Sequence, residues 1–356
     1  MGFRDGSDAW VLQSVDGGQT WKGLDGSDKP ANVPLDVASD HGAGRGDAIG
    51  TTGDVIVLSN NGCNGGSRST LRYFAHKLTF TGTGWKLEEP VFASSDPRHC
   101  VSNQSVVRGP DGRLWLGYGE VGRLGTRQSN VHFSDDEGAT WKACREGTSG
   151  VIPGTIWPPE KDGVGFTYIF EEPTLVPLGS GVAAIWEENR KGNAPTSLKW
   201  ARFDGAKWSA IEDVDAGPIA GAVRPRMHAV SVGGREVFIA SGLRNGIFRW
   251  RDGKWTKEPV DVPLGARLSV AGDKTVMAFA VSGKDKNVVQ AWQRRADGTW
   301  TGPRELAKEE QPITKGQNGF YYPGLVVMAY APSNFVPVAW SVQGQKAIKL
   351  LRVAVE

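Results

Sequence analysis

The sequence predicts an all-β fold made of repeated antiparallel sheets, and three observations lead to this prediction. The 356 residues include 48 glycines and 14 tryptophans but few long apolar runs, which is typical of short strands joined by many turns. A turn closed by tryptophan recurs at intervals of 45 to 67 residues. Each interval also contains further strand-like segments. Repeats of this length, each able to form one four-stranded sheet, predict a β-propeller.

The recurring turn is clearest in two places. SVDGGQTW (14–21) and SDDEGATW (134–141) share Ser, Asp, Gly, Thr and Trp at the same positions, and four looser copies are FTGTGW (80–85), RFDGAKW (202–208), WRDGKW (250–255) and RRADGTW (294–300). The aspartate can accept hydrogen bonds from the backbone of its own turn. Glycine permits a positive φ, and tryptophan can pack between sheets. We therefore expect these turns to be scaffold and not catalytic.

Strand-like segments precede these turns along most of the chain. The paired segments are DAIGTTGDVIVLS (47–59), QSVVRGPDGRLWLGYG (104–119), PTLVPLGSGVAAIWEE (173–188), HAVSVGGREVFIAS (228–241) and RLSVAGDKTVMAFAV (267–281). A third segment runs into the turn itself, as at 130–141, 197–208, 246–255 and 287–300. All are short and bounded by Gly, Asp or Pro, so they read as antiparallel strands. We expect no helix of useful length.

The two ends of the chain determine the number of blades that the sequence predicts. Residues 9–21 supply a third strand and its turn without inner strands, whereas 324–342 supply inner strands without a turn. Joining them in one blade gives a six-bladed β-propeller of four-stranded antiparallel blades, with residues 1–356 as a single domain. Residues 346–355 resemble an extra third strand. A seven-bladed propeller is therefore the alternative.

Composition excludes several classes of function. The net charge of +2 is too small to indicate a nucleic-acid partner, and no segment approaches the roughly 20 apolar residues of a membrane helix. No dinucleotide-binding, phosphate-binding or zinc-protease motif is present, so we expect no cofactor and no metal. We expect a monomer that binds a glycan substrate.

Cysteines and the N-terminus are less informative. Cys63 and Cys100 could pair if loops bring them together, and Cys144 would then stay free. MGFRDGSDAW is not a signal peptide, so a secreted or periplasmic location is expected only if a leader was removed before this numbering begins.

The pattern S-x-D-x-G-x-T-W resembles the Asp box, or BNR repeat, of the sialidase superfamily of β-propellers. With the looser copies, the resemblance covers nearly the whole chain. It implies a glycosidase in which an arginine triad clamps the carboxylate of the sugar. It also implies a tyrosine nucleophile activated by a glutamate, and an aspartate as acid/base.

Three segments resemble the catalytic machinery of that family. EEPTLVPLGSGVAAIWEENR (171–190) implies Glu172 as the carboxylate that activates the tyrosine and Arg190 as a triad member. FYYPGLVVMAYAPSNFVPVAW (320–340) implies Tyr322 as the nucleophile. SGLRNGIFRWRDGKW (241–255) implies Arg244 as a second triad member.

The sequence also departs from the family. Its opening Arg-Ile-Pro motif is absent, and Arg45 is the nearest substitute, with Asp47 beside it as the expected acid/base. A whole unit, 265–303, separates Arg244 from Tyr322, where the family has none.

A second argument does not depend on the family. In a propeller the innermost strands begin near the central channel, so the residues just before them face the expected pocket. These are His41, Arg45, Asp47, Arg98, His99, Asn103, Glu171, Glu172, Arg224, Arg226, His228, Arg267, Tyr321 and Tyr322. Arginines suit a carboxylated sugar, and His or Tyr suits proton transfer. We therefore add Arg98, His99, Arg226 and His228 as substrate-binding candidates, whereas Tyr118, Tyr330 and His132 are expected to pack between sheets.

Three functions fit these residues. The first is a sialidase-like glycoside hydrolase that removes a terminal acidic sugar from glycans. The second is a polysaccharide lyase on uronate polymers, with His99 or His228 as base, Tyr322 as acid and Arg226 neutralising the carboxylate. The third is a non-catalytic glycan-binding or protein-binding propeller, which the missing motif and the extra unit favour.

Overall fold

The structure is a computed structural model, and it describes the chain in segments. The described residues are 2–5, 8–14, 16, 19–23, 27–28, 31–33, 48–50, 54–60, 73–80, 85–87, 91–92, 100–121, 127–144, 152, 173–188, 197–214, 227–240, 246–272, 274–313, 324–331, 334–345 and 348–356. They contain strands, bridges and turns, and no helix. Two compact units divide the chain: Met1–Gly192 with Lys199–Glu212, and Asn193–Leu198 with Asp213–Glu356.

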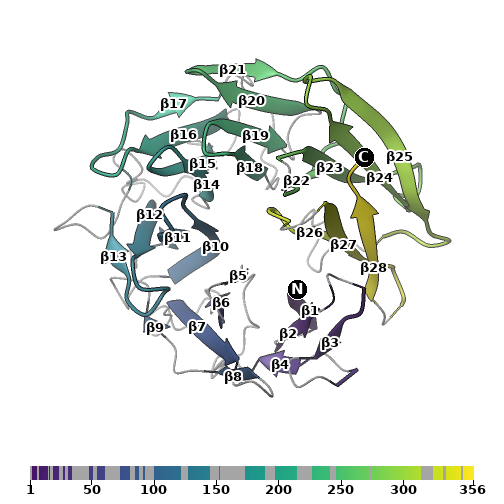
Figure 1. The fold of residues 1–356 in the computed structure, drawn as a ribbon, viewed down its shortest axis with the longest axis horizontal. Coiled ribbons are helices and arrows are strands. Elements are labelled where there is room, and N and C mark those ends of the chain that lie inside the picture. Colours follow the sequence, from purple (N-terminus) through teal and green to yellow (C-terminus); the bar gives the residue numbers. More distant parts are fainter. Residues whose placement is uncertain are drawn as a thin grey trace, which may run out of the picture. The chain divides into compact units, whose positions relative to one another are not determined.

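The first unit contains most of four sheets, labelled in Figure 1. The first is β1 (Gly2–Asp5), β2 (Asp8–Gln13), β3 (Lys22–Gly23) and β4 (Ala31–Val33); the second is β5 (Ala48–Gly50), β6 (Asp54–Asn60), β7 (Tyr73–Phe80), β8 (Trp85–Leu87) and β9 (Val91–Phe92). The third is β10 (Cys100–Arg108), β11 (Leu114–Val121), β12 (Arg127–Ser134) and β13 (Lys142–Ala143); the fourth is β14 (Thr174–Leu178), β15 (Gly181–Glu188), β16 (Ser197–Phe203) and β17 (Glu212–Asp213).

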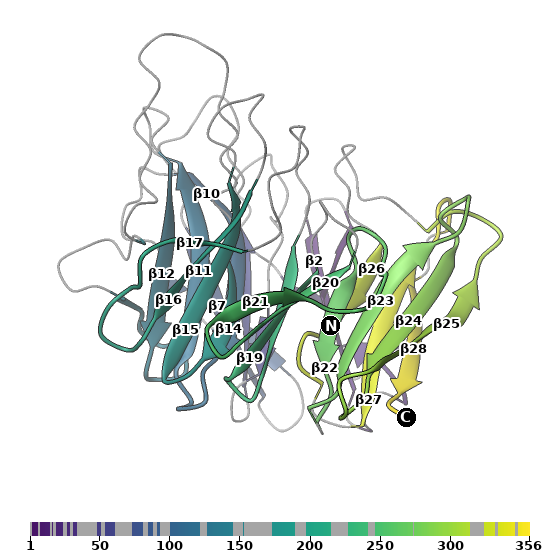
Figure 2. The ribbon, with the colours of Figure 1, turned by 90° about the horizontal axis from the view of Figure 1, so that it is seen from above.

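The second unit contains three sheets. The fifth sheet is β18 (His228–Val232), β19 (Glu236–Ala240), β20 (Ile247–Arg251) and β21 (Lys254–Lys257); the sixth is β22 (Arg267–Val270), β23 (Val276–Ser282), β24 (Val288–Arg294) and β25 (Trp300–Lys308); the seventh is β26 (Leu325–Val327), β27 (Phe335–Ser341) and β28 (Ile348–Ala354). Figure 2 shows β22 to β25 following one another across their sheet.

The sheets follow sequence order because short turns join antiparallel neighbours. In the sixth sheet Val270 lies opposite Val276 across the turn that joins β22 to β23, and β23 pairs in turn with β24. Each strand–strand register that the structure describes in the named strands is antiparallel. The predicted fold class, all-β with four-stranded antiparallel sheets, is confirmed.

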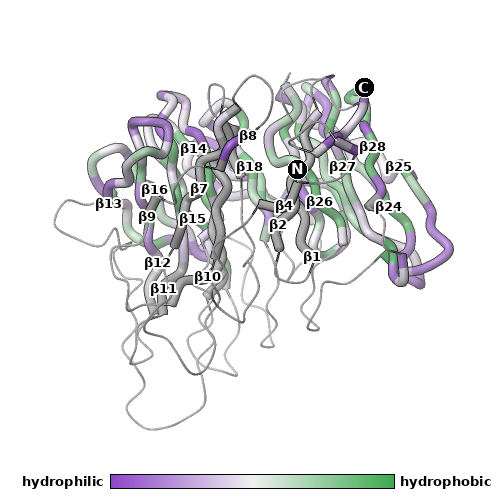
Figure 3. The backbone as a smooth tube through the Cα atoms, turned by 90° about the horizontal axis from the view of Figure 1, so that it is seen from below, coloured by the Kyte–Doolittle hydropathy of each residue, from purple (hydrophilic) through white to green (hydrophobic). Residues whose placement is uncertain are grey.

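Apolar side chains on the sheet faces form a core in each unit. In the first unit Trp115, Trp186 and Phe203 pack together between sheets. In the second unit one cluster surrounds Phe238 and Trp292, and another surrounds Phe279 and Trp340. In Figure 3 the coloured strands carry hydrophobic colour along parts of their length, and hydrophilic colour gathers at turns. This distribution is what burial of sheet faces requires.

One glycine is required by close packing of two strands. A Cβ atom added to Gly181 would lie 1.9 Å from the carbonyl oxygen of Phe203. Because real side chains never approach a backbone oxygen so closely, only glycine fits where β15 begins beside the end of β16.

The described strands form seven sheets. The six-blade count placed strands from both ends of the chain in one sheet. In the described pairings β2 joins β1, β3 and β4, whereas β27 lies between β26 and β28. Residues 348–354 form the third strand of the seventh sheet, so the seven-blade alternative matches the described strands.

Neither a membrane span nor a metal site is found in the described part of the chain. No helix there is long and apolar enough to cross a bilayer. No group of three or more His, Cys, Asp or Glu side chains in these segments is placed to hold a metal ion. Cys144 is free and buried, and the proposed pair Cys63 and Cys100 lies outside the side chains that the structure describes.

Candidate functional site

The tryptophan-closed turns have the hydrogen bonds that the sequence predicts. The Asp136 carboxylate accepts from the Thr140 backbone N–H at 2.9 Å and from the Thr140 hydroxyl at 2.5 Å. The Ser134 hydroxyl donates to Asp136 at 2.7 Å and accepts from the Gly138 N–H at 2.8 Å. Asp16 makes the matching bonds with Ser14 and Thr20. Each turn is thus organised from within by one carboxylate.

These hydrogen bonds occupy the carboxylates and hold them ionised. Burial alone would raise the pKa of Asp136, but hydrogen bonds from Thr140 and Ser134 lower it to about 2. The Thr20 hydroxyl and backbone likewise lower the pKa of Asp16 well below its usual range. A carboxylate held in its ionised form by its own turn is a poor proton donor near neutral pH. The prediction that these turns are scaffold is consistent with this geometry.

Most of the expected site residues lie outside the described residues. They are Tyr322, Glu172, Asp47, Arg45, Arg190, Arg244, Arg226, Arg98 and His99. Their roles stay predictions. His228 is described, and so is Arg267, which the sequence placed among the residues that precede inner strands.

His228 and Arg267 lie at equivalent places in consecutive sheets. His228 is the first residue of β18, and Arg267 is the first residue of β22. The backbone N–H of Leu268, next to Arg267, donates a hydrogen bond of 3.0 Å to Nδ1 of His228. Both side chains are partly buried. One hydrogen bond therefore links the beginnings of the two strands.

This hydrogen bond fixes the protonation of His228. A backbone N–H can only donate, so Nδ1 carries no proton and the neutral ring has its proton on Nε2. Burial, together with the positive charge of Arg267, lowers the pKa of His228 to about 3. Near neutral pH the ring is neutral, its lone pair at Nδ1 is occupied, and Nε2–H is a donor.

The same geometry removes one alternative role. A general base needs a free lone pair within reach of the proton that it takes. His228 has none, because its only unprotonated nitrogen accepts from Leu268. In this arrangement His228 can donate from Nε2 but cannot take a proton at Nδ1, so of the two histidines that the lyase hypothesis offers as base only His99 stays a candidate. A binding role for His228 stays a prediction.

Arg267 carries a charge that its surroundings disfavour. Burial lowers the pKa of its guanidinium to about 10, so the group stays protonated near neutral pH. No ion pair joins it to a residue that the structure describes. A partly buried cation is stabilised when an anion lies beside it.

Tyr330 and its two neighbours in the chain connect strands β18 and β22. Its hydroxyl accepts a hydrogen bond of 3.0 Å from the backbone N–H of Ser231 in β18. The neighbouring residues of Tyr330 bond to β22: the Val270 N–H donates to Ala329, and the Ala331 N–H donates to Val270, both at 2.8 Å. The residue is 37% exposed, so Tyr330 connects sheets, as expected, without being fully buried. Tyr118 and His132 are buried and share a hydrogen bond of 3.0 Å.

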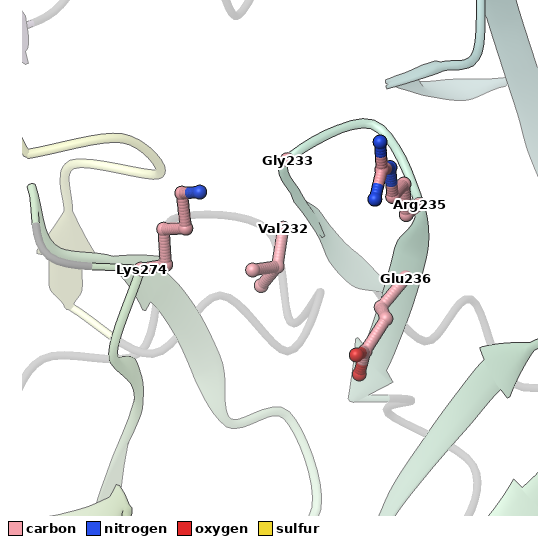
Figure 4. Close-up of a pocket in the computed structure, with 5 residues that line it drawn as sticks. All are labelled: Val232, Gly233, Arg235, Glu236 and Lys274. Atoms are coloured by element: carbon pink, nitrogen blue, oxygen red, sulfur yellow. The ribbon is translucent and has the colours of Figure 1, made fainter. Parts of the chain in front are cut away.

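Two described cavities lie away from His228 and Arg267. One of about 340 Å³ is lined by Val232, Gly233, Arg235, Glu236 and Lys274. It is at the far ends of β18 and β22, and in Figure 4 the Glu236 carboxylate points away from the Arg235 guanidinium. Glu236 is already paired with Arg251 at 3.3 Å. The other cavity, of about 330 Å³, is lined by Asp261, Pro263, Leu264, Lys286 and Trp292. Neither contains an expected site residue.

Two buried glutamates link consecutive sheets, and the sequence analysis did not identify them. Glu258, just after β21, accepts from the Trp300 indole at 2.7 Å and from Arg294 at 2.9 Å. Glu309, just after β25, accepts from the Trp340 indole at 2.8 Å and from Lys349 at 2.5 Å. In both repeats the fourth strand ends with Lys, and Glu follows it directly. That recurrence is the signal that could have found them.

Comparison with known proteins adds information on the fold. No known family model matches the chain, and no curated protein matches it. The chain is similar to the structure of an α-L-arabinanase from Penicillium chrysogenum complexed with arabinobiose. The TM-score is 0.52 and the identity 11%, over 85% of this chain and 90% of that one.

Two further structures are similar at lower scores. A Hadza microbial sialidase has a TM-score of 0.49 and 15% identity, over 88% of this chain and 65% of that one. The Aleuria aurantia lectin in complex with α-methyl-L-fucoside has a TM-score of 0.48 and 11% identity, over 87% of this chain and 94% of that one. The likeness to the arabinanase, together with the four-stranded sheets, shows that the fold is a β-propeller.

Proposed function

We propose that the protein is a carbohydrate-active propeller, and specifically a sialidase-like glycoside hydrolase that removes a terminal acidic sugar from glycans. The observation that carries the proposal is the repeated turn built on Asp16 and Asp136 within a β-propeller fold. That turn is what makes the resemblance to sialidase-type propellers specific.

The proposed mechanism assigns one step to each residue. The Tyr322 oxygen attacks the anomeric carbon while Glu172 takes the phenol proton, and Asp47 protonates the departing glycosidic oxygen. Asp47 then takes a proton from water, which attacks the same carbon and releases Tyr322, whose proton returns from Glu172. Arg45, Arg190 and Arg244 hold the sugar carboxylate throughout.

The experiment is the release of 4-methylumbelliferone from its sialic acid glycoside. We expect release by the wild type, a loss of at least about a hundredfold in Tyr322→Phe, and a large loss in Glu172→Gln. Tyr330→Phe is the matched control. It makes the same change at a tyrosine whose hydroxyl accepts a hydrogen bond from the Ser231 N–H and has no proposed catalytic role. No release by the folded wild type, or equal release by Tyr322→Phe, would overturn the hydrolase assignment.

A non-catalytic glycan-binding propeller is the second candidate. The observation that favours it is that the two described groups, His228 and Arg267, are a hydrogen-bond donor and a cation. Neither is a base or a nucleophile in this arrangement. Glycan binding without any hydrolysis of the sialoside would select this function.

A further inference from the structure

We propose that Arg267 and His228 form a binding subsite for an anionic group, a carboxylate or a sulfate, on the glycan. This proposal depends on the proposed function in one respect only, namely that the ligand is a glycan. Arg267 belongs to the unit 265–303, which the resemblance to sialidases leaves without a counterpart. The anion at this subsite is therefore a second one, distinct from the carboxylate held by Arg45, Arg190 and Arg244.

The first argument is the contrast between Arg267 and other arginines. Among the described side chains, each of the other partly buried arginines has a carboxylate partner. These are Arg108 with Glu137, Arg113 with Asp135, Arg202 with Glu212, Arg249 and Arg294 with Glu258, and Arg304 with Glu356. Arg267 has no such partner among these residues. Its guanidinium has five donors and is suited to a planar, bidentate anion.

The second argument is the direction of donation by His228. Nδ1 is occupied by the Leu268 N–H at 3.0 Å, which leaves Nε2–H to donate. No partner of Nε2 is found in the described part of the chain. A neutral donor beside a cation complements an anionic oxygen and disfavours a second cation. The pair therefore selects for negative charge on the ligand.

The third argument is that the His228 ring is held in place before a ligand arrives. His228 and Arg267 begin two strands, and the Leu268 hydrogen bond fixes the imidazole ring. A pre-organised donor such as this ring loses less conformational entropy on binding. The substrate class that follows is a glycan with more than one anionic group.

The test measures the binding of three disaccharides by calorimetry in a Tyr322→Phe background. The probes are neutral lactose, a sulfated lactose, and an unsulfated chondroitin disaccharide, which carries a carboxylate. We expect at least one anionic probe to bind about tenfold or more tightly than lactose. Arg267→Gln should abolish this difference, whereas Arg295→Gln, the same change at an exposed arginine, should keep it. Comparison of the sulfate and carboxylate probes identifies which anion the subsite takes.

The histidine is tested by a matched pair of variants. His228→Asn offers an oxygen near the position of Nδ1 for the Leu268 N–H but lacks the outer donor. His228→Gln places an amide donor near the position of Nε2. We expect weaker binding of the anionic probe in His228→Asn and partial recovery in His228→Gln. Equal binding in wild type, Arg267→Gln and His228→Asn would overturn the proposal.

A spectroscopic measurement covers the case in which Arg267→Gln does not fold. Nitrogen NMR of the wild-type His228 ring, assigned with His228→Asn, should show a proton on Nε2 and a shift of Nε2 when the anionic probe is added. An unshifted ring at saturating probe would overturn the proposal. The binding test uses Tyr322→Phe and therefore does not depend on hydrolysis. If the protein binds the anionic probe but the wild type does not hydrolyse the sialoside, the result counts against the proposed function and not against the subsite.

Discussion

At the scale of single residues, one hydrogen bond determines what His228 can do. The bond from the Leu268 N–H places the ring proton on Nε2. Burial and Arg267 then keep the ring neutral down to a pKa of about 3. The sequence analysis treated His228 as a candidate for both binding and proton abstraction. The structure occupies the lone pair that proton abstraction needs, and the binding role stays a prediction.

Tyr330 provides a prediction about stability. Tyr330→Phe removes the acceptor of the Ser231 N–H, which lies 3.0 Å from the hydroxyl oxygen. Because Ser231 is buried, its N–H would be left without that partner, and we expect a loss of about 1–3 kcal/mol in the free energy of unfolding. Urea denaturation of the wild type and the variant measures this difference in the free energy of unfolding. Met328→Leu, at an equally exposed neighbour, should change stability by less than about 0.5 kcal/mol. Equal stability of the two variants would contradict the prediction.

Glu309 predicts how stability depends on pH. Burial opposes its ionisation, but hydrogen bonds from Lys349 and Trp340 lower its pKa below the ordinary value. A carboxyl whose pKa is lower in the folded state contributes stability above its unfolded-state pKa. That stability is lost as the pH falls through the folded-state pKa.

The measurement for Glu309 compares two proteins by urea denaturation between about pH 6 and pH 3. We expect wild type to lose stability on acidification, and Glu309→Gln to be less stable at pH 6 but to lose less between these values. The conservative change keeps an acceptor for the Trp340 indole. Parallel curves for the two proteins would show that Glu309 does not contribute to the acid sensitivity.

Single residues show what the sequence could and could not predict about the site. Arg267 and His228 were found because each directly precedes or begins an inner strand, and strand boundaries are visible in the pattern. The bond between His228 and Leu268 spans 40 residues. No local pattern predicts it, because it depends on how consecutive sheets pack.

At the scale of elements, the tryptophan-closed turns act as local clamps. In the third sheet the turn at 134–141 connects β12 to β13, and its hydrogen bonds lie within eight residues. Such local bonds form without help from distant parts of the chain. This explains why their geometry could be predicted from the sequence, whereas the recurring Lys-Glu pair marks the positions of Glu258 and Glu309 but not their partners in the next sheet.

Asp136 provides the prediction at this scale. Asp136→Ala removes the acceptor of the Thr140 N–H, the Thr140 hydroxyl and the Ser134 hydroxyl. We expect a loss of about 1–2 kcal/mol, since the turn is exposed to water that replaces part of these bonds. Asp135→Ala is the matched control, because it removes the same charge together with ion pairs to the partly buried Arg113 and the exposed Lys142, but no hydrogen bond within the turn. Thermal unfolding compares the two, and a larger loss in Asp135→Ala would contradict the clamp.

At the scale of the whole molecule, the strand pattern predicted the paired strands of the sheets, whereas it left the ends of the chain open between six and seven blades. Each of the paired segments named from the sequence became two neighbouring strands, as with 267–281 and the strands β22 and β23. The ends were harder because a missing strand can be supplied by either end of the chain. In the described pairings β28 (Ile348–Ala354) supplies the third strand beside β27.

Deletion of residues 346–356 distinguishes the two blade counts. In the seven-sheet arrangement β28 covers the edge of β27, where Val338 lies opposite Leu351 and Trp340 opposite Lys349. Its removal would expose the unpaired edge of β27, whose apolar residues are buried. We therefore expect the truncated protein to aggregate or to unfold at a temperature several degrees lower.

The six-blade arrangement predicts the opposite result. There a strand from the N-terminal end would lie beside residues 335–341, and residues 346–355 would be a dispensable extra strand. Amide hydrogen exchange of Val336, Val338 and Trp340 separates the two cases. Fast exchange at these positions in the truncated protein supports seven blades, because β28 is then their pairing partner. Protection equal to that of the full chain would show that the N-terminal strand can take its place and would restore the six-blade count.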